Sequence, residues 1–218
     1  MTRGRWLTLT GWAGIVGPVL FTLAFVGQEL ARRDEYSPLA EQVSALEAGP
    51  NGWIQQLNFV VFGVLTMVFA VGLHRGLRPV RLGVIGPALF FVTGIAAIMA
   101  GVFPLREDAA GVTYDPGGHM PAGMTFFLGS TLALIAVSFR VARDPRWRSL
   151  RFFIATVALL MVVGNVLMVR LVIPDDAPLH EWAGLGQRIL VVGLLFPARI
   201  VLASRLILTA REQAVRAT

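Results

Sequence analysis

The 218-residue sequence has no cysteine and no lysine, and only 15% of its residues are charged. The lack of cysteine excludes disulfides, cysteine-ligated metals and thiol nucleophiles. Because a soluble domain carries about 25% charged residues, the shortage of charge argues against a water-soluble enzyme. The 56% of hydrophobic residues and the mean hydropathy of +0.69 instead indicate a chain that is solvated by lipid.

Six stretches without Asp, Glu or Arg fall along the chain, and each predicts a helix. The last of these helices is interrupted by charge. A membrane-spanning helix needs about 20 apolar residues to cross a hydrocarbon core of about 30 Å. The sequence therefore predicts an all-α integral membrane bundle, with residues 1–218 in a single domain. The first helix is too long for a signal-peptide core and no cleavage site follows it, so we expect it to remain as a span. The six predicted helices are 7–29, 52–74, 82–103, 120–140, 150–173 and 183–207.

The arginines at the helix ends and in the connections are unevenly distributed. The terminal segments, the connections on their side and the adjoining helix ends hold 13 arginines, whereas the opposite connections hold three. Positive charge is retained on the cytoplasmic side of a membrane, so both termini are predicted to be cytoplasmic. Arginine as the only basic residue type suggests a high-GC bacterial genome, and the predicted location is the bacterial cytoplasmic membrane.

The net charge of +6 could also suit nucleic-acid binding. However, the arginines lie at helix ends along one membrane surface, and no nucleic-acid motif is present, so we expect no nucleic acid as a partner. The arginines between Arg140 and Arg151, with Trp147 among them, are expected to anchor the protein to anionic lipid headgroups.

The opposite, outer connections hold 11 of the 13 acidic residues and are longer than the inner ones. Long loops are where functional residues tend to gather. In the first outer loop, Leu39, Val43 and Leu46 are spaced by four and three residues. This spacing predicts a short amphipathic helix on the membrane surface over Pro38–Glu47.

Arg188 is the most informative residue, because it lies about 12 Å below the expected outer end of the sixth helix. A buried arginine needs a partner or a water-filled cavity, so we expect a polar cavity there, with Glu29 as the nearest counter-ion. Arg199, eleven residues later on almost the same face, is expected to extend its stem to the inner headgroups.

Uncharged polar residues accompany Arg188 at the outer ends of other helices. Gln56 and Asn58 open the second predicted helix, while Asn165 and Arg170 lie in the fifth. Amides join membrane helices as readily as they bind ligands, and an arginine near the surface can extend to water. A ligand-binding role and a structural role therefore both stay open for these residues.

Three glycines, Gly11, Gly14 and Gly17, recur every three residues along the first predicted helix. This spacing lets a neighbouring backbone approach closely. Packing is favoured over a ligand role, and the same stripe could form an oligomer interface.

Two outer histidines, His119 and His180, occur with carboxylates such as Asp108, a combination that suits zinc binding or acid and base chemistry. Neither an HxxxH nor an HExxH spacing is present, so we predict no metal site and no cofactor. A Ser44, His119 and Asp108 hydrolase triad is formally available, but any chain with 11 outer acids offers one.

Several of these residues form short motifs in a fixed order: Ser44-Ala45-Leu46, Asn58-Phe59 with Gly63, Phe103-Pro104 followed by Asp108, then His119, and Gly186-Gln187-Arg188. In this order the chain resembles a bacterial and archaeal six-helix membrane family catalogued as domain of unknown function 998. The resemblance covers nearly the whole chain and implies the six-helix fold without assigning an activity. The stretch Ser44–Asn58 is also faintly similar to the first loop of the Frag1, DRAM and Sfk1 proteins, which are implicated in lipid handling.

The leading hypothesis is a membrane protein whose outer polar cavity binds, and possibly modifies, a lipid-like anionic ligand. Arg188 would clamp the anion with its fork of donors, and Asp108 with His119 would transfer protons. The other expected ligand-binding residues are Gln187, Asn58, Gln56, Glu29, Arg170, Asn165, Ser44 and His180. The alternatives are a small transporter or proton-coupled permease, and a non-catalytic assembly partner.

Overall fold

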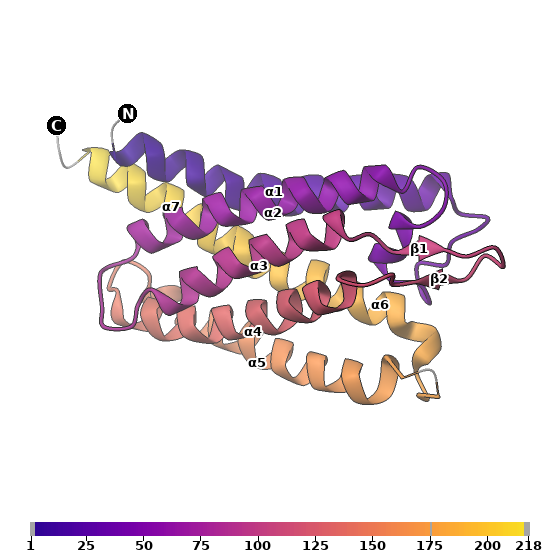
Figure 1. Ribbon diagram of the computed structural model, residues 1–218. Coiled ribbons are helices and arrows are strands. Elements are labelled where there is room, and N and C mark those ends of the chain that lie inside the picture. Colours follow the sequence, from indigo (N-terminus) through magenta and orange to yellow (C-terminus); the bar gives the residue numbers. More distant parts are fainter. Residues whose placement is uncertain (1–2, 175, 216–218) are drawn as a thin grey trace.

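The computed structural model describes residues 3–174 and 176–215 and is built almost entirely from helices (Figure 1). In this described part, six helical segments are long and apolar enough to cross a membrane, which confirms the predicted fold class. The first five are α1 (Arg3–Ala31), α2 (Trp53–Gly76), α3 (Ile85–Val102), α4 (His119–Arg143) and α5 (Arg151–Leu167), the last extended by the π-helical turn η3 (Met168–Val172). The sixth runs through α6 (Ala183–Arg188), the π-helical segment η5 (Ile189–Leu195) and α7 (Phe196–Val215).

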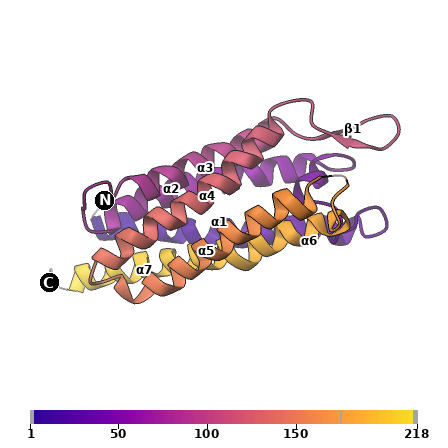
Figure 2. The same cartoon turned by 90° about the horizontal axis from the view of Figure 1, so that it is seen from below.

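The helices form a closed bundle. Each long helix packs against its neighbour in sequence, and the sixth span contacts both α1 and α5. Both termini lie at one end, whereas an antiparallel hairpin of β1 (Arg106–Glu107) and β2 (Thr113–Tyr114) extends from the other (Figures 1 and 2). We call the end with the termini and residues 77–84 and 144–150 the Arg-rich end. The end with residues 32–52, 103–118 and 176–182 is the outer end, after its predicted orientation.

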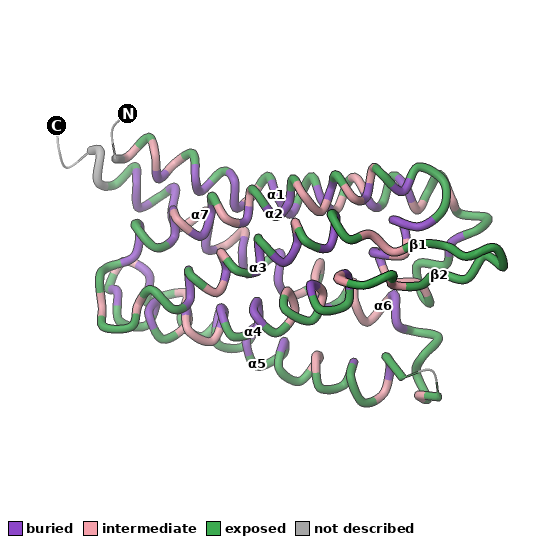
Figure 3. Tube along the Cα trace, in the orientation of Figure 1, coloured by how far each residue is buried: buried purple, intermediate pink, exposed green. Residues whose placement is uncertain are grey.

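Buried and exposed positions alternate along the helices (Figure 3), as expected where one side of a helix faces the bundle and the other faces lipid. The fifth span is the least covered: 28% of its apolar window is buried, against 50% for α3. Its exposed residues are almost all apolar, including Phe152, Leu159 and Val169. These exposed side chains therefore suit contact with lipid.

The sixth span is not the uniform helix that the sequence predicts. Its π-helical segment ends at Leu195, two residues before Pro197, the second residue of α7. Proline has no N–H to donate and its ring crowds the preceding turn, so a wider turn before it accommodates the missing hydrogen bond. The span also continues to Val215, beyond the predicted end at 207.

The first outer loop differs from its predicted structure. It forms a 3-10 helix, η1 (Val43–Glu47), which is shorter than the predicted Pro38–Glu47 helix. Val43, Ser44, Leu46 and Glu47 are all buried, because the segment inserts between the helix ends instead of lying on the membrane surface. Val43 and Leu46 are thus buried against protein and not against lipid, whereas Leu39, the third residue of the predicted apolar face, is 51% exposed.

The glycine stripe of α1 is occupied within the chain. A Cβ added at Gly11 would lie 2.5 Å from the Ile207 side chain, and one at Gly14 would lie 2.5 Å from Phe69. At Gly17 it would lie 2.9 Å from Nη2 of Arg199. The packing interpretation is therefore confirmed, and an oligomer formed through α1 would have to use another side of that helix.

At the Arg-rich end, the expected lipid anchoring of Arg140 and Trp147 is wrong. Trp147 is fully buried, and Arg140 is only 4% exposed. The Arg140 guanidinium donates to the carbonyl oxygens of His74 and Leu77, both at 2.9 Å, where α2 ends. The last carbonyls of a helix lack partners within it and carry its negative dipole end, so the Arg140 cation stabilises the end of α2.

Asp144 organises the same end from the α4–α5 connection. Its carboxylate accepts hydrogen bonds from the backbone N–H of Arg78 (2.9 Å) and from Nη2 of Arg146 (2.7 Å). Burial raises the pKa of the Asp144 carboxyl, but the hydrogen bonds from Arg146 and Arg78 together outweigh it, so the pKa is lowered. Asp144 therefore stays ionised and holds two connections together.

Candidate functional site

The first outer loop closes the outer end by binding the start of the sixth span. The backbone N–H of Leu185 donates to the carbonyl of Leu39 at 2.9 Å. Farther along, the backbone N–H of Val43 donates to Oε1 of Gln187 at 2.7 Å. The predicted ligand-binding residue Gln187 thus holds the loop in place.

Arg188 lies beneath this loop, and its predicted counter-ion is confirmed. Its Nε lies 3.1 Å from Oε1 of Glu29, and its Nη2 contacts the same oxygen. Nη2 also donates to the Tyr36 hydroxyl at 2.6 Å, and Nη1 donates to the carbonyls of Glu41 and Gly184. The two side chains of the ion pair are 14% and 12% exposed.

All five N–H groups of the Arg188 guanidinium therefore have an acceptor within the chain. A bound anion would have to take the place of the Glu29 carboxylate. Tyr36, which sequence reasoning missed, also donates toward the carbonyls of Glu41 and Gln42. Burial raises the Tyr36 pKa to about 12, so its hydroxyl remains protonated.

His119 meets a carboxylate, but it is Glu47 and not the predicted Asp108. Nδ1 of His119 lies 3.0 Å from Oε2 of Glu47, and the Glu47 side chain is fully buried. The same oxygen accepts the backbone N–H of Leu105 at 3.2 Å. The other oxygen, Oε1, is buried and has no hydrogen-bond partner among the residues that the structure describes.

Burial is the main influence on Glu47 and raises the pKa of its carboxyl, against the lowering effect of the hydrogen bond from His119. His119 Nδ1 also lies 3.2 Å from the carbonyl of Ala100. Glu47 thus joins the first outer loop to the α3–α4 connection and to the start of α4. The signal for Glu47 in the sequence was its position directly after the Ser44-Ala45-Leu46 motif, but its burial could not be predicted from that position.

Asp108 has a local role instead. Its Oδ1 accepts the backbone N–H groups of Ala110 and Val112, both at 2.9 Å, inside the exposed β1–β2 turn. The start of α4 is capped by Asp115, which accepts the N–H of Met120 at 2.8 Å. That bond is the largest influence on the lowered pKa of Asp115. Within the part of the chain that the structure describes, no three His, Asp or Glu side chains come together to hold a metal ion.

A cluster of three amides lies below these residues. Oε1 of Gln55 accepts hydrogen bonds from Gln28 and Asn58, both at 3.1 Å. Two atoms of the cluster, Oε1 of Gln28 and Nε2 of Gln55, are buried without a partner in the described part of the chain. The predicted residue Asn58 thus belongs to a helix-joining cluster, while the half-buried Gln56 lies outside its hydrogen bonds.

The remaining predicted site residues stand apart from Arg188 and His119. Asn165 donates to Thr131 at 3.1 Å and joins α5 to α4. Arg170 is exposed, and His180 is an exposed residue whose Nδ1 lies 3.1 Å from the carbonyl of Val172. Ser44 is buried in the inserted loop.

Arg199 does not extend to the headgroups, so the prediction for this residue is wrong. It is 2% exposed, in the interior of the bundle. Its Nη1 donates to the Thr66 hydroxyl at 2.5 Å, and its guanidinium lies 4.8 Å and 5.3 Å from the ring centres of Phe62 and Phe69. Its Nη2 lies 3.4 Å from the carbonyl oxygen of Ala13. Within residues 3–174 and 176–215, its Nε has no partner, and none of these contacts is a carboxylate.

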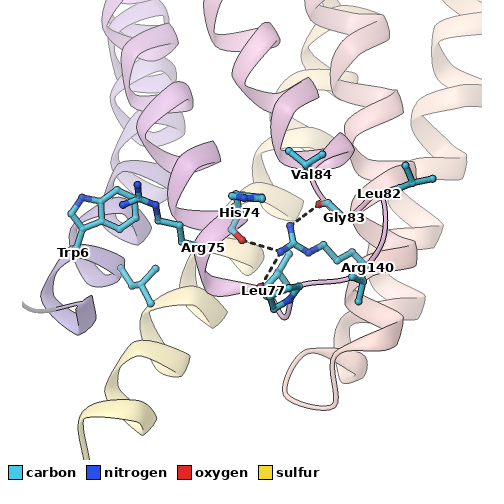
Figure 4. Close-up of a pocket in the computed structure, with 11 residues that line it drawn as sticks. Trp6, His74, Arg75, Leu77, Leu82, Gly83, Val84 and Arg140 are labelled. Carbon is cyan, nitrogen blue, oxygen red and sulfur yellow. Dashed lines mark hydrogen bonds between the residues drawn. The ribbon is translucent and has the colours of Figure 1, made fainter.

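Two cavities lie away from the outer end. One of about 640 Å³ lies at the Arg-rich end (Figure 4), and one of about 240 Å³ lies between α1 and the sixth span. At the outer end, the polar residues close on one another beneath the first loop. The outer cavity stays a prediction.

Comparison with known proteins gives one match. The model of a family described as a protein of unknown function, DUF998, matches residues 15–204. No curated protein and no solved structure matches the chain. Because the family model covers well over half of the 218 residues, the chain belongs to the DUF998 family.

Proposed function

We propose that this multi-pass membrane protein binds a lipid-like anionic ligand at its outer end and exchanges a proton with it through Glu47 and His119. The observation that carries the proposal is the unpartnered oxygen of the fully buried Glu47 carboxylate beside His119. Leaving a buried polar atom without a hydrogen bond costs about 1–3 kcal/mol. A hydroxyl or amine of a ligand would supply the missing donor.

The anionic group of the ligand would bind Arg188. A guanidinium offers a planar fork of donors to phosphate or carboxylate, and Glu29 now occupies that fork. The ligand would exchange with Glu29 when the first outer loop separates from the sixth span. This loop is attached to the span through main-chain atoms and through the Gln187 and Arg188 side chains, so these are the hydrogen bonds that such an opening would break.

The position of the site favours an amphiphile over a fully soluble ligand. Arg188 and His119 both lie at outer ends of membrane spans, next to the headgroup region, so a ligand with an apolar tail could reach them from the bilayer. The chemical step is proton transfer or hydrolysis, with Glu47 and His119 as the acid and base pair.

The test is native mass spectrometry of the detergent-purified protein, with extraction and identification of whatever copurifies. Glu47→Gln is the decisive variant, because it keeps the shape of the side chain and leaves Arg188 paired. Loss of one defined anionic amphiphile from Glu47→Gln and from Arg188→Gln is expected. Asp108→Asn is the matched control at the same end and should retain the adduct, with circular dichroism to verify folding.

The proposal fails if wild type carries no specific adduct, or if a specific adduct survives in folded Glu47→Gln. An adduct that is lost from all three variants would instead report a general loss of outer surface charge, and it would also contradict the proposal.

A second candidate, a small transporter of an anion or proton, is favoured by Arg199. A buried arginine inside a bundle, held without a carboxylate, is a mark of transport pathways. Uptake or proton flux measured in vesicles should then vanish in Arg199→Leu and persist in Arg170→Leu. Equal flux in both variants would remove this candidate.

A further inference from the structure

The cavity of about 640 Å³ at the Arg-rich end is unrelated to the outer residues. It lies where the start of α1, the end of α2, the α2–α3 connection and the end of α4 meet (Figure 4). Its volume falls in the range of small-molecule sites, about 300–1,000 Å³. Its lining residues are Trp6, Leu7, His74, Arg75, Leu77, Pro79, Val80, Leu82, Gly83, Val84 and Arg140.

The charged residues of this lining are positive. The lining includes two arginines and one histidine but no Asp or Glu. The guanidinium of Arg75 lies 4.6 Å from the ring centre of Trp6, and these two side chains stand on the opposite side of the cavity from Arg140 (Figure 4). An anion between them would be approached by positive charge from two helices.

Arg140 fixes one wall of the cavity. Its four hydrogen bonds go to the carbonyls of Arg78, Gly83, His74 and Leu77. A guanidinium has five N–H groups, so one N–H of Nη1 has no acceptor among the residues that the structure describes. The oxygen of a bound phosphate is the acceptor that such a group recognises.

The rim of the cavity is apolar and faces outward. Leu82 is 70% exposed and Val84 is 53% exposed. Leu82 also has a φ of 60°, a left-handed conformation that is unfavourable for a non-glycine residue. Trp6 adds an indole, which is enriched at the level of the headgroups.

We propose that this cavity binds the phosphate of an anionic phospholipid from the adjacent leaflet. Arg75 and Arg140 contact the phosphate, and Leu82 and Val84 contact the upper part of an acyl chain. A phosphate next to apolar chains matches a cavity with a basic interior and an apolar rim. A free inorganic phosphate shares the first half of this chemistry but gains nothing from the rim.

The experiment is native mass spectrometry after incubation of the full chain with phosphatidylglycerol or with phosphatidylcholine of the same acyl chains. Arg75→Gln is expected to reduce retention of phosphatidylglycerol about tenfold, the effect of losing one charge-assisted hydrogen bond. Arg81→Gln is the matched control, because Arg81 is exposed on the nearby α2–α3 connection but does not line the cavity. Trp6→Leu should give a smaller loss.

Each other outcome overturns the proposal. Equal retention of the two lipids would exclude recognition of anionic headgroups, and equal losses in Arg75→Gln and Arg81→Gln would reduce the effect to general surface charge. Competition by excess inorganic phosphate, with no preference for the lipid, would assign the cavity to a free anion. The adduct at the outer end should be unchanged in Arg75→Gln, which separates this test from that of the proposed function.

Discussion

Arg188 and Arg199 lie on the same membrane span, eleven residues apart, in opposite kinds of surroundings. Arg188 is paired with the Glu29 carboxylate at the outer end. Arg199 is enclosed in the interior, where its contacts are the Thr66 hydroxyl and aromatic faces such as that of Phe62. The charge of Arg188 is thus neutralised by a carboxylate, whereas the charge of Arg199 is stabilised only by dipoles and aromatic rings.

The difference separates stability from function. Removing one partner of a buried ion pair leaves the other charge uncompensated, whereas removing an arginine that has no carboxylate leaves no opposite charge behind. Arg188 is therefore expected to contribute to the integrity of the outer end. Arg199 is expected to cost stability, and a buried cation that costs stability is a candidate for a functional role.

The largest effect should come from breaking the outer ion pair. Arg188→Met should lower the free energy of unfolding by about 3–5 kcal/mol, because Glu29 is left buried without a partner. The Glu29→Met and Arg188→Met double variant should recover most of this loss. The measurement is the midpoint of thermal unfolding in detergent by circular dichroism, with the exposed Arg170→Met as control. An unchanged midpoint in Arg188→Met would erase the contrast with Arg199.

Replacing the central arginine should have the opposite sign. Arg199→Met should be neutral or should raise the free energy of unfolding by about 1–4 kcal/mol, since an apolar side chain replaces a desolvated charge. Thr66 remains satisfied, because its hydroxyl donates to the Phe62 carbonyl at 2.7 Å. The same thermal unfolding experiment decides it. A loss of stability would show that the aromatic faces and the hydroxyl stabilise the cation fully.

A glycine next to Arg199 sharpens the comparison. Gly17→Ala should cost about 1–3 kcal/mol, because the added Cβ would lie 2.9 Å from Nη2 of Arg199 and 3.3 Å from Cβ of Leu65. In the Arg199→Met background the cost should shrink, since methionine is flexible. Gly27→Ala is the matched control on the same helix, where nothing lies within 4 Å. A cost that does not depend on residue 199 would place the strain at Leu65.

The smallest effect on stability concerns the hydrogen bonds of Asp144 at the Arg-rich end, and it appears only at acidic pH. The pKa of Asp144 is lowered from its ordinary value of 3.8, so its stabilising contribution is complete above that value and is lost as the pH falls below it. The thermal midpoint of wild type should therefore decline below about pH 4, and Asp144→Asn should lack that part of the decline. Asp34→Asn, an exposed carboxylate, should behave as wild type. An identical decline in Asp144→Asn would assign the acid sensitivity to other groups.

The spans could be predicted from the sequence because their cause is local. Six apolar stretches of sufficient length have no stable alternative to helices in lipid, and their observed starts lie within four residues of the predicted ones. Glu29 could also be identified as the partner of Arg188, because both were counted to the same depth. The glycine stripe was correctly assigned to packing, because its spacing alone places the three glycines on one side of the helix.

The candidate site could be predicted only in part. Arg188 was found from its depth in an apolar span and His119 from the carboxylates that accompany it. Glu47 follows the Ser44-Ala45-Leu46 motif, but it is one of several outer acids and its position does not reveal its burial. Asp108 is another outer acid, and it lies in an exposed turn. The difference comes from the path of the first loop, which buries one carboxylate and leaves the other in water.

The sequence by itself determined that this protein is surrounded by lipid, how many spans it has and at which end of the bundle its arginines gather. These properties depend on composition and on residue order. Only the tertiary structure decided which way each span is rotated and where the first loop inserts. Rotation and loop insertion depend on contacts between residues far apart in the chain. For that reason Arg199 points into the bundle, Arg140 binds the end of α2, and Glu47 meets His119.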